Sequence, residues 1–169
     1  MNSPKRKQIR LKNYDYSQNG YYFVTICTQN RQNIFGDVGA DSISARIIKN
    51  TFIQTINMYE YVYCPVFVVM PNHFHCIIAI QRDMESRADM ESAPTVTVSL
   101  PDIIQSFKRH STIEYIKLVK QNILTPFDKR IWQRGYYEHI IRSEQEYQKI
   151  YEYIQNNPLK WQEDKYYEQ

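Results

Sequence analysis

The sequence has little glycine and cysteine, and none of its hydrophobic runs is long enough to cross a membrane. It contains four glycines and three cysteines in 169 residues. Cys27, Cys64 and Cys76 show no CxxC spacing and cannot all pair, which argues against a zinc–thiolate site and suits a reducing compartment. The N-terminus also lacks the apolar core of a signal peptide. We therefore expect a cytoplasmic protein that does not enter a membrane.

Acidic residues are absent from the first twelve positions, although the net charge of the whole chain is only +3. The basic residues of this stretch are Lys5, Arg6, Lys7, Arg10 and Lys12. We interpret residues 1–13 as a basic arm that binds phosphate groups, while a solvated terminus without a binding role explains the same charges equally well. The composition, 43% hydrophobic and 23% charged, is typical of one globular domain over residues 1–169.

Stretches rich in β-branched and aromatic residues predict four strands, over residues 21–28, 61–69, 73–80 and 136–141. Pro65 indicates an irregularity or an edge position in the second strand. Helical spacing of apolar residues predicts one helix over about 42–58 and another from Ser99 onward, with apolar sides that include Ile43, Ile53, Ile113 and Ile116. The order β-α-β-β-α-β predicts an α+β fold, a ferredoxin-like antiparallel sheet with helices packed on one face.

A last helix is predicted to begin at the capping box Ser143-Glu144-Gln145-Glu146 and to end at Asn157-Pro158. Its apolar stripe, with the spacing i, i+3, i+4, i+7, consists of Tyr147, Ile150, Tyr151 and Ile154. Tyr153 and Asn157 lie on the flank of that stripe, four residues apart and therefore adjacent. A tyrosine and an amide there can face a cleft, although two ordinary surface residues would show the same spacing.

Two histidines, His73 and His75, follow the turn signal Pro71-Asn72 at the start of the third strand. Residues i and i+2 of a strand share a face, so the two imidazoles lie side by side and Phe74 points into the core. Two neutral imidazoles on one face form half of a site for a divalent metal. Two partly exposed histidines at a strand entrance are the alternative.

Further basic residues are candidates for nucleic-acid binding. Lys108 and Arg109 lie on the second helix, and Arg130, Trp132 and Arg134 lie in the connection that follows it. A basic group beside an aromatic ring can hold a phosphate and stack a base, but a buried Trp132 among surface arginines is an equally good interpretation. Residues 82–97 contain a duplicated Asp-Met-Glu-Ser and are expected to form a mobile loop.

Three ordered motifs resemble the HUH single-tyrosine transposases, and most of all their REP-associated branch. They span residues 68–75, 132–142 and 153–158, and the resemblance extends roughly from Tyr14 to Trp161. It implies that His73 and His75 bind a divalent metal, Mg²⁺ or Mn²⁺, and that Tyr153 attacks a phosphate of single-stranded DNA. Asn157 would complete the metal site, where the insertion-sequence relatives typically have the longer Gln.

The resemblance thus implies an enzyme, a metal-dependent transposase or endonuclease that cleaves and rejoins single-stranded DNA through a 5′-phosphotyrosine intermediate. It also implies a hairpin or palindromic DNA partner, association with the nucleoid on DNA binding, and a monomer rather than a dimer. Two alternatives stay open. One is a non-catalytic nucleic-acid-binding module with aromatics exposed on the sheet face, and the other is an inactive relative of the transposases.

Overall fold

The computed structural model describes residues 11, 13–38, 42–82 and 97–167. The strands of this part are β1 (Gly20–Cys27), β2 (Val62–Val69), β3 (His73–Ile80) and β4 (Tyr137–Ile141). The helices are α1 (Ile43–Ile56), α2 (Leu100–Lys120) and α3 (Glu144–Asn156), with short 3₁₀ helices at Gln29–Arg31 and Asn157–Glu163. No helix in these ranges combines the length and the hydropathy needed to cross a membrane.

Two features predicted from the sequence fall outside the described residues. The first is the basic arm with Lys5, Arg6, Lys7, Arg10 and Lys12. The second is the predicted loop over 82–97, of which only the end residues Arg82 and Thr97 are described. Arg82 is fixed at the end of β3, where its guanidinium donates to the carbonyl of Val98 at 2.7 Å.

The four strands form one antiparallel sheet in the order β2-β3-β1-β4. This is the strand order of the predicted ferredoxin-like fold, which is therefore confirmed. β2 lies at an edge, and its register shifts between Tyr63 and Val66, around Pro65, as the proline indicated. The central pair sets the site, because Thr25 of β1 lies opposite His75 of β3 and Cys27 lies opposite His73.

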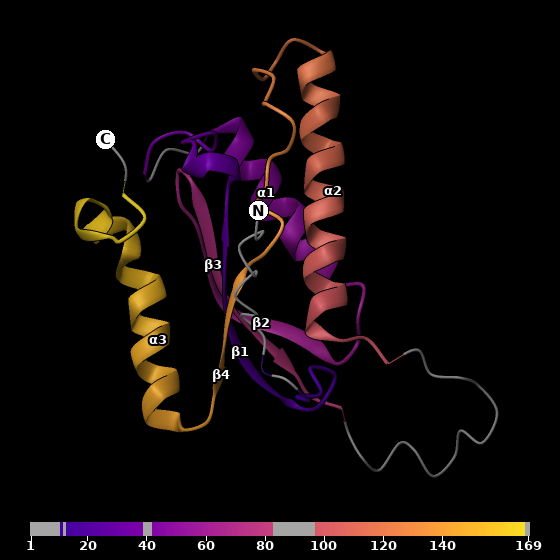
Figure 1. Cartoon of the computed structure of the whole chain (residues 1–169), viewed down its shortest axis with the longest axis vertical. Coiled ribbons are helices and arrows are strands. Elements are labelled where there is room, and N and C mark those ends of the chain that lie inside the picture. Colours follow the sequence, from indigo (N-terminus) through magenta and orange to yellow (C-terminus); the bar gives the residue numbers. More distant parts are fainter. Residues whose placement is uncertain (1–10, 12, 39–41, 83–96, 168–169) are drawn as a thin grey trace, which may run out of the picture.

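The helices cover both faces of the sheet, with α1 and α2 on one side and α3 on the other (Figure 1). The larger core lies under α1 and α2 and includes Phe74, whose ring packs 4.7 Å from that of Phe52. A smaller core joins Ile154 of α3 to Phe23 and Ile77. The two helices of the predicted β-α-β-β-α-β order thus pack on one face, and the additional C-terminal helix α3 packs on the other, because β3 is apolar on both faces and is buried on both.

The apolar sides predicted for α1 and α2 are partly wrong. Ile43, Ile53, Ile113 and Ile116 are exposed. The buried side of α1 instead includes two threonines, Thr51 and Thr55, whose hydroxyls donate to backbone carbonyls one turn earlier. The C-terminal half of α2 extends beyond the end of the sheet (Figure 1), so its apolar residues have less of the core to pack against.

The last helix begins as predicted. The Ser143 hydroxyl accepts a hydrogen bond from the backbone N–H of Glu146 at 3.2 Å, and the Glu146 carboxylate accepts from the N–H of Arg142 at 2.9 Å. Ile154 of the predicted stripe is buried, whereas Tyr147, Ile150 and Tyr151 are half-buried. This packing leaves Tyr153 on the flank of α3, with 39% of its surface exposed.

Candidate metal and tyrosine site

The two histidines lie side by side and fully buried, so the alternative of a partly exposed pair is wrong. Their ring centroids are 4.4 Å apart. Nδ1 of His73 lies 2.9 Å from Oδ1 of Asn72, whose Nδ2 donates to the carbonyl of Tyr166 at 2.8 Å. Because Oδ1 of Asn72 can only accept, Nδ1 of His73 carries the hydrogen and Nε2 keeps its lone pair. Nδ1 of His75 is likewise held by the hydroxyl of Thr25, at 2.8 Å.

Burial keeps both imidazoles neutral at pH 7. The loss of solvent lowers the pKa of His73 to about 4, and it lowers the pKa of His75 well below its ordinary value. The neutral imidazole is the form that binds a metal ion, since a protonated nitrogen has no lone pair to donate. The two neutral imidazoles can therefore bind a cation, and they carry no positive charge that would attract an anion.

Tyr153 reaches the histidines from the flank of α3. Its hydroxyl lies 3.3 Å from Nε2 of His75 and donates to Oδ2 of Asp164 at 3.0 Å. Its ring packs edge-on against Phe23, with centroids 6.1 Å apart. Burial, and then the negative charge of Asp164, raise the pKa of Tyr153, so the hydroxyl keeps its proton in this arrangement.

Asn157 is buried at the start of the last 3₁₀ helix, beside Tyr153 as its spacing predicted. Its Nδ2 donates to Oδ2 of Asp164 at 2.6 Å. Its Oδ1 is buried and has no hydrogen-bond partner within the described ranges, and the same is true of Nε2 of His73. Buried acceptors without partners are rare and point to a ligand such as an ion. Both atoms are of types that ligate divalent cations.

Asp164 is the residue of this site that sequence reasoning missed. One ligating atom each from His73, His75 and Asp164 lie within 4.8 Å of one another. The sequence places Asp164 in a terminal tail without apolar periodicity, and an acidic residue there gives no signal that separates it from Glu163. The fold brings it in because the segment after α3 turns back, so that Tyr166 packs 4.7 Å from the ring of His73.

The donor set fits a divalent cation. It offers two imidazole nitrogens, a carboxylate oxygen and an amide oxygen, and all four side chains are buried or half-buried. Asn72 and Thr25 fix the orientation of the two rings, as outer partners of metal-binding histidines do. The arrangement can therefore hold a cation next to the hydroxyl of a tyrosine.

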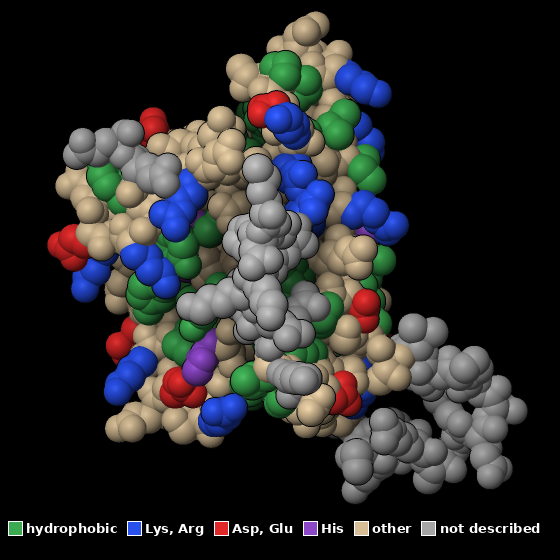
Figure 2. Space-filling view, in the orientation of Figure 1, with side chains coloured by type: hydrophobic (Ala, Val, Ile, Leu, Met, Phe, Trp, Pro, Cys, Tyr) green, Lys and Arg blue, Asp and Glu red, His purple; other side chains and the backbone are tan. Residues whose placement is uncertain are grey.

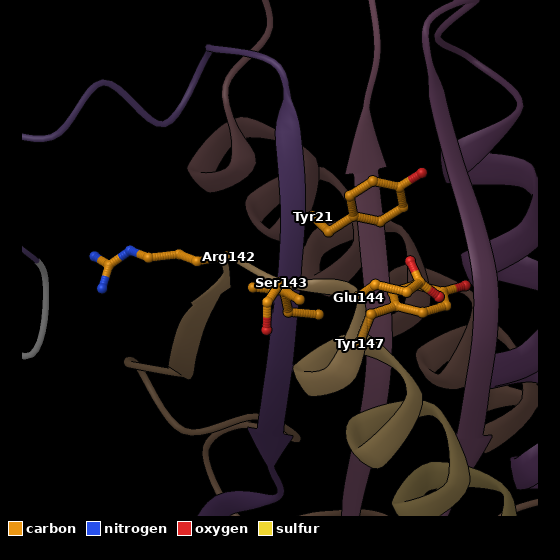
Figure 3. A pocket seen from close by; sticks show the side chains of 6 residues that line it. Tyr21, Arg142, Ser143, Glu144 and Tyr147 are labelled. Atoms are coloured by element: carbon orange, nitrogen blue, oxygen red, sulfur yellow. The ribbon is translucent and has the colours of Figure 1, made fainter.

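A hollow of about 340 Å³ gives access to Tyr153, and its lining residues are Lys149, Glu152, Tyr153, Asn156, Asn157, Lys160, Glu163 and Asp164. A second hollow of about 360 Å³ lies at the other end of α3, between Tyr21 and Tyr147 (Figure 3). Tyr21 pairs with Ala79, six residues along β3 from His73 and hence roughly 20 Å away. The second hollow is of similar size, but it has no part in the candidate site.

The residues expected to bind nucleic acid lie in different environments. Trp132 is only 4% exposed, packs on Phe35 and Phe107, and donates from its indole nitrogen to the hydroxyl of Ser111 at 2.9 Å. The expectation that Trp132 stacks a base is therefore wrong, and the alternative of a core tryptophan is correct. No local pattern could separate the two, because both need the same residue in the same place.

Lys108 holds a loop together. Its ammonium donates to the carbonyls of Gln133 at 2.9 Å and Gly135 at 2.8 Å. Arg109 and Arg134 are exposed and Arg130 is half-buried. On the face shown in Figure 2, Lys and Arg side chains gather along α2, the helix that contains Arg109. The side chains of Arg109, Arg130 and Arg134 are thus accessible to the phosphates of a nucleic acid, whereas the ammonium of Lys108 is hydrogen-bonded within the protein.

Comparison with known proteins gives consistent results. A family model described as "Transposase IS200 like" matches residues 16–157. An uncharacterized protein of Haemophilus influenzae is 34% identical over 96% of this chain and 93% of its own length. A second protein of that organism, provisionally named a REP-associated tyrosine transposase, is 24% identical over 89% of this chain and 77% of its own. Among solved structures, a REP-associated tyrosine transposase bound to a REP hairpin has a similar fold, with a TM-score of 0.55 and 20% identity over 90% of this chain and 73% of that one.

Proposed function

The chain belongs to the IS200-like transposase family, and from that premise we propose a metal-dependent transposase or endonuclease that cleaves and rejoins single-stranded DNA. The reaction would pass through a 5′-phosphotyrosine intermediate on Tyr153. One observation carries the proposal: the Tyr153 hydroxyl lies 3.3 Å from Nε2 of His75, beside a cluster of metal-ligating side chains. Among the described residues, no other tyrosine has its hydroxyl within hydrogen-bond distance of a ring nitrogen of His73 or His75.

In the proposed reaction the Tyr153 oxygen attacks the phosphorus of a DNA phosphate. The bond from phosphorus to the 3′ oxygen breaks, leaving a free 3′ hydroxyl on one fragment and a tyrosine-linked 5′ phosphate on the other. The hydrogen bond to Oδ2 of Asp164 orients the Tyr153 hydroxyl, whose proton is released to solvent as its oxygen attacks, and the departing oxygen takes a proton from solvent. Because the phosphodiester is exchanged and not hydrolysed, a 3′ hydroxyl can reverse the step and rejoin the strand.

We propose that His73, His75 and Asp164 hold the divalent cation, Mg²⁺ or Mn²⁺, together with Oδ1 of Asn157. The support is the two buried acceptors that otherwise lack partners. When bound, such a cation polarises a phosphate and stabilises the charge that builds up on it. Asn72 fixes the tautomer of His73, and Asn72 and Thr25 together hold the two imidazoles in orientations that suit ligation.

The proposed DNA partner is a single strand next to a hairpin. The solved structure with the similar fold is of a transposase bound to a REP hairpin, which supports a hairpin partner here. Arg109, Arg130 and Arg134 are proposed to contact its backbone, together with the arm from Lys5 to Lys12. We also propose that the protein acts as a monomer, because Tyr153 reaches the histidines of its own chain.

The test is incubation of the protein with a labelled single strand flanked by a hairpin, in the presence of Mn²⁺, followed by denaturing electrophoresis. The proposal predicts a labelled protein adduct that survives SDS and disappears in excess chelator. A fully paired duplex of the same sequence is the control and should give no adduct. Adduct formation in excess chelator would contradict the metal requirement.

The two alternatives make different predictions. A non-catalytic module that binds bases on an open sheet needs a continuous aromatic surface there. On this face α3 covers Phe23, which is only 8% exposed, and leaves aromatic rings accessible mainly on the edge strands, such as Tyr137 on β4. An inactive relative of the transposases would bind the hairpin strand and the metal but give no adduct. The adduct assay therefore separates it from the proposed enzyme.

A further inference from the structure

Two cationic side chains from distant parts of the chain meet on one aromatic ring beside the candidate site. The guanidinium carbon of Arg31 lies 5.4 Å from the centre of the Tyr166 ring, and the ammonium of Lys165 lies 4.9 Å from it. Lys165 also lies 5.6 Å from the centre of the Tyr137 ring, on β4. Because Tyr166 packs against both His73 and His75, these two cations border the histidine pair.

The backbone that carries Arg31 is held in an unusual conformation. Asn30 and Arg31 have φ angles of 53° and 52°, in the left-handed region. Asparagine tolerates this region, but an arginine there is strained and persists only where surrounding contacts enforce it. The enforcing contacts are backbone hydrogen bonds from Gln29 to Ile131 at 2.6 Å and from Arg31 to Thr28 at 3.1 Å. The fold thus keeps Arg31 in an unfavourable backbone conformation, and in this conformation its guanidinium lies beside the candidate site.

The local charge is suited to an anion. Lys165 is exposed and, within the described ranges, contacts two aromatic rings but forms no ion pair. The carboxylate of Asp164, which accepts hydrogen bonds from Tyr153 and Asn157, belongs to the proposed metal site, where a bound cation would offset its charge. An approaching phosphate would therefore meet two cations next to the metal-ligating cluster.

We propose that Arg31 and Lys165 form a phosphate-binding subsite for the nucleotide next to the scissile phosphate of the substrate strand. The inference rests on the proposed action on single-stranded DNA. A guanidinium binds phosphate through two parallel hydrogen bonds and an ammonium acts as a point charge, so the pair would fix the strand's position without reading its sequence. The exposed ring of Tyr137, 43% accessible beneath Lys165, offers a surface on which the adjoining base can stack.

The experiment measures binding without chemistry. A fluorescent oligothymidine is titrated with Tyr153→Phe protein in Mn²⁺ at several salt concentrations, and the anisotropy gives the affinity. Arg31→Asn and Lys165→Gln are introduced into this background. Asparagine suits the left-handed backbone of position 31, so this variant removes the charge and relieves the strain. Each variant is expected to lower the slope of log affinity against log salt by about 0.7, the value for one lost phosphate contact on a single strand.

Two matched controls keep the charge at the site. Asn30→Gly relaxes the same turn without touching Arg31, and Lys49→Gln removes an exposed lysine from α1 on the opposite side of the sheet. Both should leave the salt slope unchanged. If Arg31→Asn does not fold, as judged by its melting curve, Arg31→Gly replaces it, since glycine adopts positive φ freely.

The outcomes separate this inference from the proposed function. An unchanged salt slope in both charge-removing variants would overturn the subsite, even if the wild-type protein forms the DNA adduct. A fall in slope confined to those variants would support the subsite, even if the wild-type protein forms no adduct. If the salt slope of Lys49→Gln falls by the same amount, the loss of any positive charge explains the change in slope, and this result would likewise overturn the proposal.

Discussion

The hydroxyl of Tyr153 donates a hydrogen bond of 3.0 Å to Oδ2 of Asp164. The same oxygen accepts from Nδ2 of Asn157 at 2.6 Å, and the other carboxylate oxygen accepts from the backbone N–H of Tyr166 at 2.7 Å. One carboxylate therefore joins α3, the 3₁₀ helix that follows it, and the terminal turn above the histidines. It holds the proposed nucleophile next to the proposed metal ligands.

Replacing Asp164 should weaken metal binding. Asp164→Asn keeps the shape of the side chain but removes its negative charge, so the affinity for Mn²⁺ is expected to fall by more than about tenfold. Calorimetric titration with Mn²⁺ measures this directly, without DNA. Glu163→Gln, at the exposed acid one residue earlier, is the matched control and should bind Mn²⁺ like the wild-type protein. Equal affinities in the two variants would exclude Asp164 as a ligand.

The stability of the metal-free protein should depend on pH through His73. The folded pKa of about 4 lies below the value of about 6.5 expected in the unfolded chain, so the unfolded chain binds more protons between these values. The free energy of unfolding should therefore be highest above pH 6.5 and fall as the pH drops toward 4, by an amount on the order of 3 kcal/mol. Urea unfolding at a series of pH values measures the change.

His73→Gln serves as the reference for that measurement. It removes the titrating ring, so the comparison concerns the slope against pH and not the absolute stability. The variant should show a shallower dependence between pH 4 and 6.5. The same slope in variant and wild type would assign the pH dependence to other groups.

Trp132 should matter for stability and not for DNA binding. Trp132→Phe removes the hydrogen bond to Ser111 and leaves unfilled volume beside Phe35 and Phe107, at a cost of about 1–3 kcal/mol. Affinity for single-stranded DNA, measured on the folded variant, should be unchanged. Arg134→Gln should behave in the opposite way, because Arg134 is exposed. A stable Trp132→Phe protein with reduced affinity would restore the base-stacking interpretation.

Much of the fold could be predicted because its signals are local. The alternation and turn chemistry around Pro71-Asn72 placed His73 and His75 on one face of a strand, and their side-chain contacts follow from that register. The heptad-like stripe through Ile154 oriented α3 well enough to put Tyr153 and Asn157 on its flank. In each case the period of the secondary structure decides which side chains are neighbours.

The remainder depended on contacts between distant segments. Asp164 and Lys165 enter the site only because the chain reverses after Asn157, and no periodic pattern marks that reversal. Arg31 lies in a polar loop, and its position follows from a left-handed turn that its own side chain disfavours. The exposure of Ile113 could likewise not be predicted, because the sequence does not show where α2 extends beyond the sheet.

The central claim is that Tyr153 is the nucleophile, and the sharpest test compares two tyrosines of the same helix. Tyr153→Phe removes only a hydroxyl, so the fold and DNA binding should persist while the SDS-stable adduct with a hairpin-flanked single strand disappears. Tyr151→Phe, two residues earlier and packed toward the sheet, should form the adduct at the wild-type level. Equal adduct yields from the two variants, or a loss only in Tyr151→Phe, would contradict the assignment.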